Sequence, residues 1–108
     1  MTELMRSQRL DPNLIREAAA QAVGRLKLLA NEQRMLLLSQ LTHGEMCVND
    51  LEKRLKIYQP TLSQQLSVLR REGVVKTRHQ GKHIFYSIAD SSVLKLLVCV
   101  YRLSCPED

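Results

Sequence analysis

The chain has 108 residues and three cysteines, and it carries a formal net charge of +5 at pH 7 with 44% hydrophobic residues. This length predicts one small domain, and the basic excess favours a polyanionic partner. The sequence has no apolar signal segment and no apolar run near the roughly 20 residues of a membrane span. We therefore expect a cytoplasmic protein without a membrane partner.

Residues 1–10 are polar and are expected to be flexible. The rest of the chain, residues 11–108, is expected to form a single domain. Asp11 and Pro12 are typical of a helix start, and an apolar stripe then continues to Leu29. Asn31 is a favourable N-cap for a second helix, and the apolar residues that follow indicate that this helix extends to position 41. A third helix is expected within residues 47–57.

The stretch YQPTLSQQLSVLRREG, residues 58–73, predicts a fourth helix. Leu62, Leu66 and Leu69 recur at helical spacing and indicate its buried side. Pro60 suits the first helical position, and Gly73 suits the position just after the helix end. The third and fourth helices together predict a helix-turn-helix.

The pattern then changes to a two-residue period. Two β-prone runs, residues 74–78 and 83–88, flank the turn sequence HQGK and predict a β-hairpin. Asp90 is expected to cap a last helix that ends before Pro106, and apolar residues nearly encircle that helix. The fold class is therefore mainly α with a β-hairpin wing, a winged helix-turn-helix that forms a homodimer through its N- and C-terminal helices.

The fourth helix has amides and hydroxyls on the side opposite its leucines, and such groups can hydrogen-bond to base edges in the major groove. Paired arginines near its end suit backbone phosphates, and the basic hairpin tip suits a minor groove or flanking phosphates. The expected partner is then double-stranded DNA, in which a homodimer predicts an inverted repeat. The predicted DNA-binding residues are Gln59, Thr61, Ser63, Gln64, Gln65, Arg70, Arg71, Arg78, His79, Gln80 and Lys82.

The segments LANEQRMLLLSQL, GEMCVNDLEKRL, QPTLSQQLSVLRREGVV and IFYSI resemble the ArsR/SmtB family of bacterial winged-helix repressors. Within that family the recognition helix and the cysteine near the end of the last helix are most similar to the thiol-responsive BigR/HlyU/SqrR subgroup. The resemblance implies a repressor that leaves its operator when a small inducer modifies its cysteines. Those members pair the C-terminal cysteine with one in the second helix, where this sequence has Ser39.

The three thiols differ in their expected settings. Cys47 stands at the start of the third helix, where the helix dipole favours a reactive thiolate, although a packed small residue is an equal alternative. Cys99 is expected to pack in the core or an interface, whereas Cys105 lies at the end of the last helix and is the most accessible thiol. Reactive sulfur species or oxidants are the expected inducers. Cys99 and Cys105 do not share a helix face, so a pair or a three-thiolate site needs Cys47 or a partner subunit.

Two other functions compete with this prediction. GEMCVNDL resembles the metalloid motif ELCVCDL, but Asn49 replaces its second cysteine; an arsenite-responsive repressor using Cys47, Cys99 and Cys105 is the first alternative. A winged-helix protein-interaction module without a specific operator is the second. The scattered His43, His79 and His83 do not predict a metal site. No cofactor is expected, and no arrangement of catalytic groups suggests an enzyme.

Overall fold

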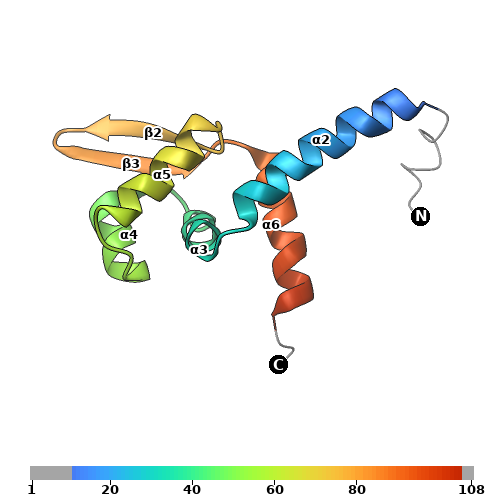
Figure 1. The fold of residues 1–108 in the computed structure, drawn as a ribbon. Helices are drawn as coiled ribbons and strands as arrows, with labels where there is room; N and C mark the ends of the chain where they lie inside the picture. Colours follow the sequence, from blue (N-terminus) through green and yellow to red (C-terminus); the bar gives the residue numbers. More distant parts are fainter. Residues whose placement is uncertain (1–10, 106–108) are drawn as a thin grey trace.

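The computed structural model describes residues 11–105, so the predicted flexible N-terminus at 1–10 and the last three residues lie outside the described residues. Eight elements follow one another along this part of the chain (Figure 1). They are α2 (Pro12–Leu29), α3 (Glu32–Leu41), β1 (Met46–Cys47), α4 (Val48–Leu55), α5 (Thr61–Arg71), β2 (Val75–Gln80), β3 (His83–Ile88) and α6 (Ser91–Ser104). No helix within residues 11–105 is long and apolar enough to span a membrane.

A leucine-rich core holds the helix-turn-helix together. Leu62, Leu66 and Leu69 of α5 are fully buried, as the helical spacing predicted. They share one cluster with apolar residues of α3, α4 and α6, namely Leu37, Leu38, Leu41, Leu51, Val93 and Leu97. Because burying a leucine side chain contributes about 1.5–3 kcal/mol, this cluster fixes how α5 sits in the domain.

The sheet has the order β1-β3-β2, with both pairs antiparallel. β2 and β3 form the predicted hairpin, which closes at the pair Gln80 and His83 and extends from one end of the domain (Figure 1). β1 pairs with β3 through Met46 and Cys47. The sequence did not predict β1, because two residues are too few to show an alternating pattern. The predicted winged helix-turn-helix is confirmed.

The start of α5 and the bounds of β2 differ from the predictions. Pro60 is the N-cap of α5 and not its first residue. Cys47 is the N-cap of α4, at the start of the third helix as expected. β2 begins at Val75 and continues to Gln80. Val74 is not part of β2, because its N–H donates to the carbonyl of Leu69 at the end of α5.

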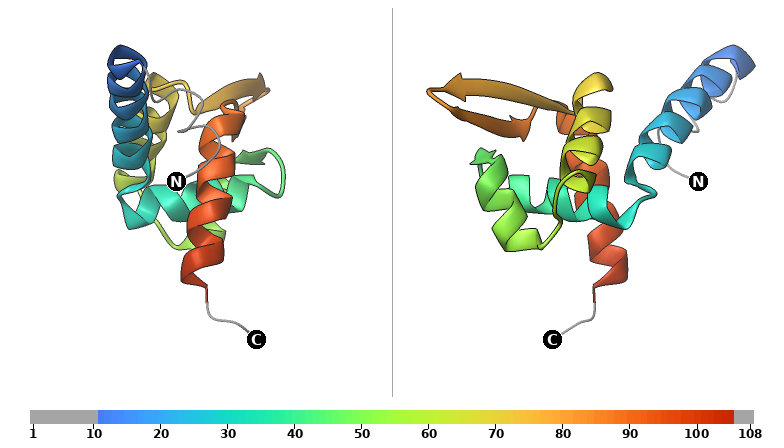
Figure 2. Two further views of the ribbon diagram at one scale, coloured as in Figure 1. Left: turned by 90° about the vertical axis from the view of Figure 1, so that its right-hand side faces the viewer. Right: turned by 60° about the vertical axis from the view of Figure 1, so that its left-hand side comes forward.

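The terminal helices α2 and α6 extend away from this core (Figures 1 and 2). Leu29 is the buried residue of α2, while Val23 and Leu26 expose 47% and 50% of their surface. On α6, Val93 and Leu97 face the core, but Leu103 is 88% exposed. The protomer thus leaves apolar side chains of both terminal helices in contact with solvent.

Asp90 caps α6, as predicted, by accepting hydrogen bonds from the backbone N–H groups of Ser92 and Val93. The hydroxyl of Ser92 also donates to this carboxylate at 2.6 Å, and this bond is the main cause that lowers the pKa of Asp90. A lowered pKa in the folded state stabilises the fold above the unfolded pKa of about 3.9. That contribution is lost as the pH falls through the folded pKa.

We expect Asp90→Ala to lower the free energy of unfolding by about 1 kcal/mol at pH 7, the usual cost of losing a helix N-cap. The difference from wild type should shrink as the pH falls below about 4, because the wild-type carboxylate then becomes protonated. Urea denaturation at a series of pH values measures both effects. Ser91→Ala is the control at an exposed neighbour, and a difference that persists unchanged at low pH would contradict the account.

Candidate nucleic-acid interface

The solvent side of α5 carries a row of short polar side chains. Ser63, Gln64 and Ser67 are exposed, and Arg70 and Arg71 follow them in the last turn. The buried leucines face the opposite way, so the whole row is available to a partner. Hydroxyls, an amide and guanidinium groups along one helix face can hydrogen-bond to both base edges and phosphates.

The first turn of α5 is stabilised by the residue before Pro60. The side-chain oxygen of Gln59 accepts a hydrogen bond from the N–H of Ser63 at 3.1 Å. Gln59 therefore satisfies a free N–H of the helix start, and Pro60 itself provides no side-chain hydrogen bond. Thr61, the first residue of α5, is half-buried.

Gln65 lies apart from the other predicted reading residues. Its side chain is half-buried and hydrogen-bonds to polar groups of α3 and the residue that caps it. Its amide nitrogen donates to Gln33 at 3.0 Å and to Asn31 at 3.3 Å, and its oxygen accepts from Arg34 at 3.1 Å. In this arrangement both ends of the amide are already engaged within the protein.

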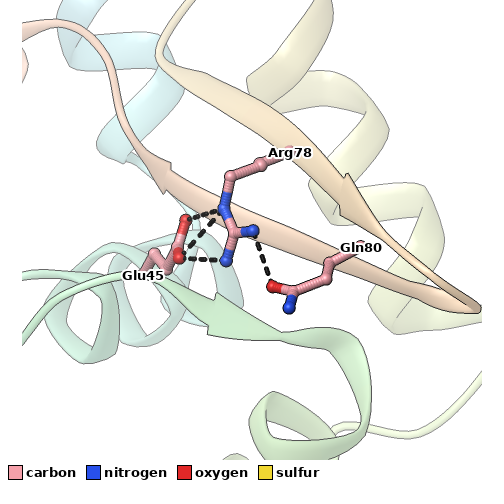
Figure 3. Close-up of polar contacts among 3 residues, drawn as sticks. All are labelled: Glu45, Arg78 and Gln80. Atoms are coloured by element: carbon pink, nitrogen blue, oxygen red, sulfur yellow. Dashed lines mark hydrogen bonds and ion pairs between the residues drawn. The ribbon is translucent and has the colours of Figure 1, made fainter.

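The wing holds Arg78 in an ion pair with Glu45, just before β1 (Figure 3). The Nε of Arg78 donates to both carboxylate oxygens of Glu45 at 3.1 Å, and Nη1 donates to Gln80 at 2.8 Å. The guanidinium also stacks 4.7 Å from the ring centre of Phe85. The hydrogen bond from Arg78 lowers the pKa of Glu45, so the pair is charged at neutral pH.

The wing tip presents the other predicted hairpin residues. His79 and Lys82 are exposed, and Gly81 takes a positive φ of 60° at the turn between the strands. Gln80 is also exposed, although its side chain accepts the hydrogen bond from Arg78. Within residues 11–105, Arg78 is in an ion pair, whereas the ammonium group of Lys82 at the wing tip is not.

The three thiols are free and lie in different settings. Cys47 is buried at the start of α4, and its sulfur donates to Asp50 at 3.4 Å. Cys99 on α6 and Cys105, the C-cap residue that follows α6, are exposed in the protomer. Cys99 was expected to pack in the core or an interface. It does not pack in the core of the protomer, and it lies on a face of α6 that no other part of the described chain covers.

Cys105 and Ser39 line the same apolar hollow of about 550 Å³ between α3 and α6. Leu94, Leu97, Val98 and Tyr101 provide most of the remaining wall. The hydroxyl of Ser39 donates to the carbonyl of Met35 and lies 2.7 Å from the Tyr101 hydroxyl. Within the described residues, no group of three or more His, Cys, Asp or Glu side chains could hold a metal ion.

Residues 31–77 match the model of the arsR family of bacterial regulatory proteins. The chain is 46% identical over 84 residues to the biofilm growth-associated repressor of Agrobacterium fabrum, covering 77% of this chain and 72% of that protein. The chain belongs to the arsR family. Its predicted resemblance to that family is therefore confirmed, and it is a DNA-binding transcriptional regulator.

Two solved structures of arsR-type regulators resemble the fold. The transcriptional repressor BigR from Xylella fastidiosa gives a TM-score of 0.83 at 36% identity, covering 90% of this chain and 99% of that chain. The homodimeric winged helix-turn-helix DNA-binding domain of Mb0332 from Mycobacterium bovis, a possible ArsR-family regulator, gives 0.68 at 30% identity, with 82% of each chain covered. The similarity to BigR supports the predicted subgroup within the arsR family.

Sequence reasoning missed two groups of residues in this arsR-family domain. Arg34 and Gln33 were part of a helix with an apolar body, and nothing local indicated that they contact Gln65, about thirty positions away. Glu45 likewise lies 33 positions from Arg78. The position of Arg34 in an apolar helix does indicate that it needs polar partners if it is partly buried, but it does not indicate which residues these are.

Proposed function

We propose that the protein is a homodimeric repressor that binds an inverted-repeat operator and is released when Cys105 is modified by a reactive sulfur species or an oxidant. The observation that supports DNA reading best is the exposed polar row of α5, opposite three fully buried leucines. In this proposal Ser63, Gln64 and Ser67 meet base edges, while Arg70 and Arg71 bind phosphates.

The exposed apolar residues of the terminal helices support the dimer. A small domain that leaves Leu14, Val23, Leu26 and Leu103 largely in solvent gains stability by burying them against a second copy. The Mycobacterium bovis relative is described as homodimeric. Two copies of α5 would then enter the major groove about one DNA turn apart, roughly 34–36 Å.

The inducer is proposed to act at the hollow between α3 and α6. Cys105 is exposed there, and Ser39 on the facing helix offers a hydroxyl and no second thiol. A bulkier or charged sulfur at Cys105 would move α6 relative to α3 and change the spacing of the two α5 helices. A coupling of about 2.7 kcal/mol corresponds to a hundredfold change in operator affinity.

The metalloid alternative has weaker support. Cys47 lies at the start of α4 and Cys99 on α6, and the described residues of one protomer bring no three such ligands together. A three-thiolate site would therefore have to form between subunits.

Footprinting on DNA from upstream of the regulated gene tests the proposal. We expect a protected inverted repeat at physiological salt, with two half-sites about 10 base pairs apart. The absence of any protected repeat would favour the protein-interaction module instead. Titration with arsenite and with polysulfide, each followed by intact mass spectrometry, separates the two classes of inducer.

The ion pair at the wing gives a separate prediction about salt dependence. If Arg70, Arg71 and Lys82 bind phosphate while Arg78 stays with Glu45, a dimer makes about six contacts and the log–log salt slope is about −5. Glu45→Gln removes the competing carboxylate, and if both Arg78 side chains then reach phosphate we expect a slope near −7.

Operator affinity measured between 50 and 200 mM salt gives both slopes. Glu72→Gln, at the exposed C-cap of α5, makes the same charge change and should leave the slope near −5. An unchanged slope in Glu45→Gln would show that Arg78 does not become a phosphate contact.

A further inference from the structure

We propose that Arg34 and Gln65 form a positioning pair that fixes α5 against the C-terminal end of α2, and that Gln65 therefore does not read a base. The inference rests on the proposed function, because the position of α5 matters through the operator it binds. The two residues would set the angle between α5, which is proposed to read DNA, and α2, which is proposed to form part of the dimer interface.

One side of this pair is built on the end of α2. The last carbonyls of a helix have no partner within the helix. The Nε of Arg34 donates to the carbonyl of Leu28 at 2.7 Å, and Nη2 donates to the carbonyl of Lys27 at 2.9 Å. A cation at this end is also favoured by the helix dipole. Arg34, although part of α3, is therefore bonded to the last turn of α2.

The other side reaches the middle of α5. Nη1 of the same guanidinium donates to the side-chain oxygen of Gln65 at 3.1 Å. The Gln65 nitrogen donates to Gln33 and Asn31, so its position is held from both ends. One planar group thus bonds α2 and α5 at once, and the end of α2 leads into α3 beside α5 (Figure 1).

This geometry conflicts with a reading role for Gln65. A glutamine that recognises adenine uses its oxygen and its nitrogen together, and here both are engaged inside the protein. The side chain of Gln64 is exposed and has no hydrogen-bond partner among the described residues, so it remains the amide suited to a base edge. The arginine fork is also specific, because a lysine has no planar set of donors that reaches three acceptors.

A comparison of matched variants tests the inference, using the full chain and a duplex that contains the operator. Gln65→Met keeps the length of the side chain and removes its hydrogen bonds, and Gln64→Met makes the same change one position away. We expect Gln65→Met to weaken operator affinity about tenfold while leaving the preference at every base position unchanged. Gln64→Met should instead relax the preference at one position.

A double-variant cycle adds a readout that a loss of fold stability would not produce. Arg34→Lys alone should also cost about tenfold, and the double variant Arg34→Lys/Gln65→Met should stay near tenfold, because both changes break the same connection. Circular dichroism at the binding temperature checks that each variant is folded. Should Arg34→Lys unfold, the two methionine variants still decide the question.

Three outcomes would overturn the inference. The first is a change in preference at a single base position in Gln65→Met, which would make Gln65 a reading residue. The second is a loss near hundredfold in the double variant, which would show independent roles. The third is a wild-type protein with no sequence-specific binding, and because it appears without any substitution, it identifies a failure of the proposed function itself.

Discussion

Cys105→Ser is expected to abolish the release of operator DNA by polysulfide, whereas the treated wild-type protein should lose about a hundredfold in affinity. A thiolate at Cys105 attacks a polysulfide, takes one sulfur to become a persulfide, and the displaced polysulfide leaves one sulfur shorter. Serine has the same shape but cannot form this bond. Fluorescence anisotropy with a labelled operator gives the affinity, and intact mass gives the gain of roughly 32 Da for each added sulfur.

The other cysteines provide controls for this experiment. Cys99→Ser removes an exposed thiol from the same helix, and Cys47→Ser removes the buried thiol at the start of α4. Both variants should still release DNA on treatment. If Cys105→Ser is released like the wild type while Cys99→Ser is not, then the sensing thiol is Cys99 and the hollow beside Ser39 has no part in the response.

Leu66→Ala should lower the free energy of unfolding by about 3 kcal/mol, within the 2–5 kcal/mol typical of buried leucines. Leu66 is 1% exposed and lies in the cluster that holds α5 against α3 and α4. A domain of this size has only about 5–15 kcal/mol of stability in total, so the unfolded fraction should rise steeply near physiological temperature. Urea denaturation at a fixed protein concentration measures the change.

Ser67→Ala is the matched control, because Ser67 is the next residue on α5 and faces solvent. Its unfolding free energy should stay within about 0.5 kcal/mol of the wild type. A loss below about 1 kcal/mol in Leu66→Ala would mean that α5 is not docked through its leucines, and the orientation of the polar row would then lose its main support.

Helical periodicity was enough to predict how α5 is oriented. The three leucines define its buried face, and Gly73, with a φ of 74°, ends it where expected. The hairpin was predictable for a similar reason, since its β-prone runs flank a turn with Gly81. These features depend on neighbours within a few residues, so a single sequence contains them.

The role of Gln65 could not be predicted in the same way. It lies on the flank of α5, and whether a flanking side chain meets water or protein depends on where α3 docks. Arg78 presents the same problem, because a cation on a wing suits phosphate until Glu45 is placed beside it. Such pairings join residues more than thirty positions apart. They follow from tertiary packing, which periodicity does not contain.

The exposed apolar side of α2 has a consequence for how stability depends on the amount of protein. Val23 and Leu26 would be buried only in the proposed dimer, so folding and association would be linked by mass action. The melting temperature would then rise with protein concentration. Dilution would separate the subunits and reduce operator occupancy more steeply than the first power of concentration, which gives the regulator a threshold of abundance below which it does not act.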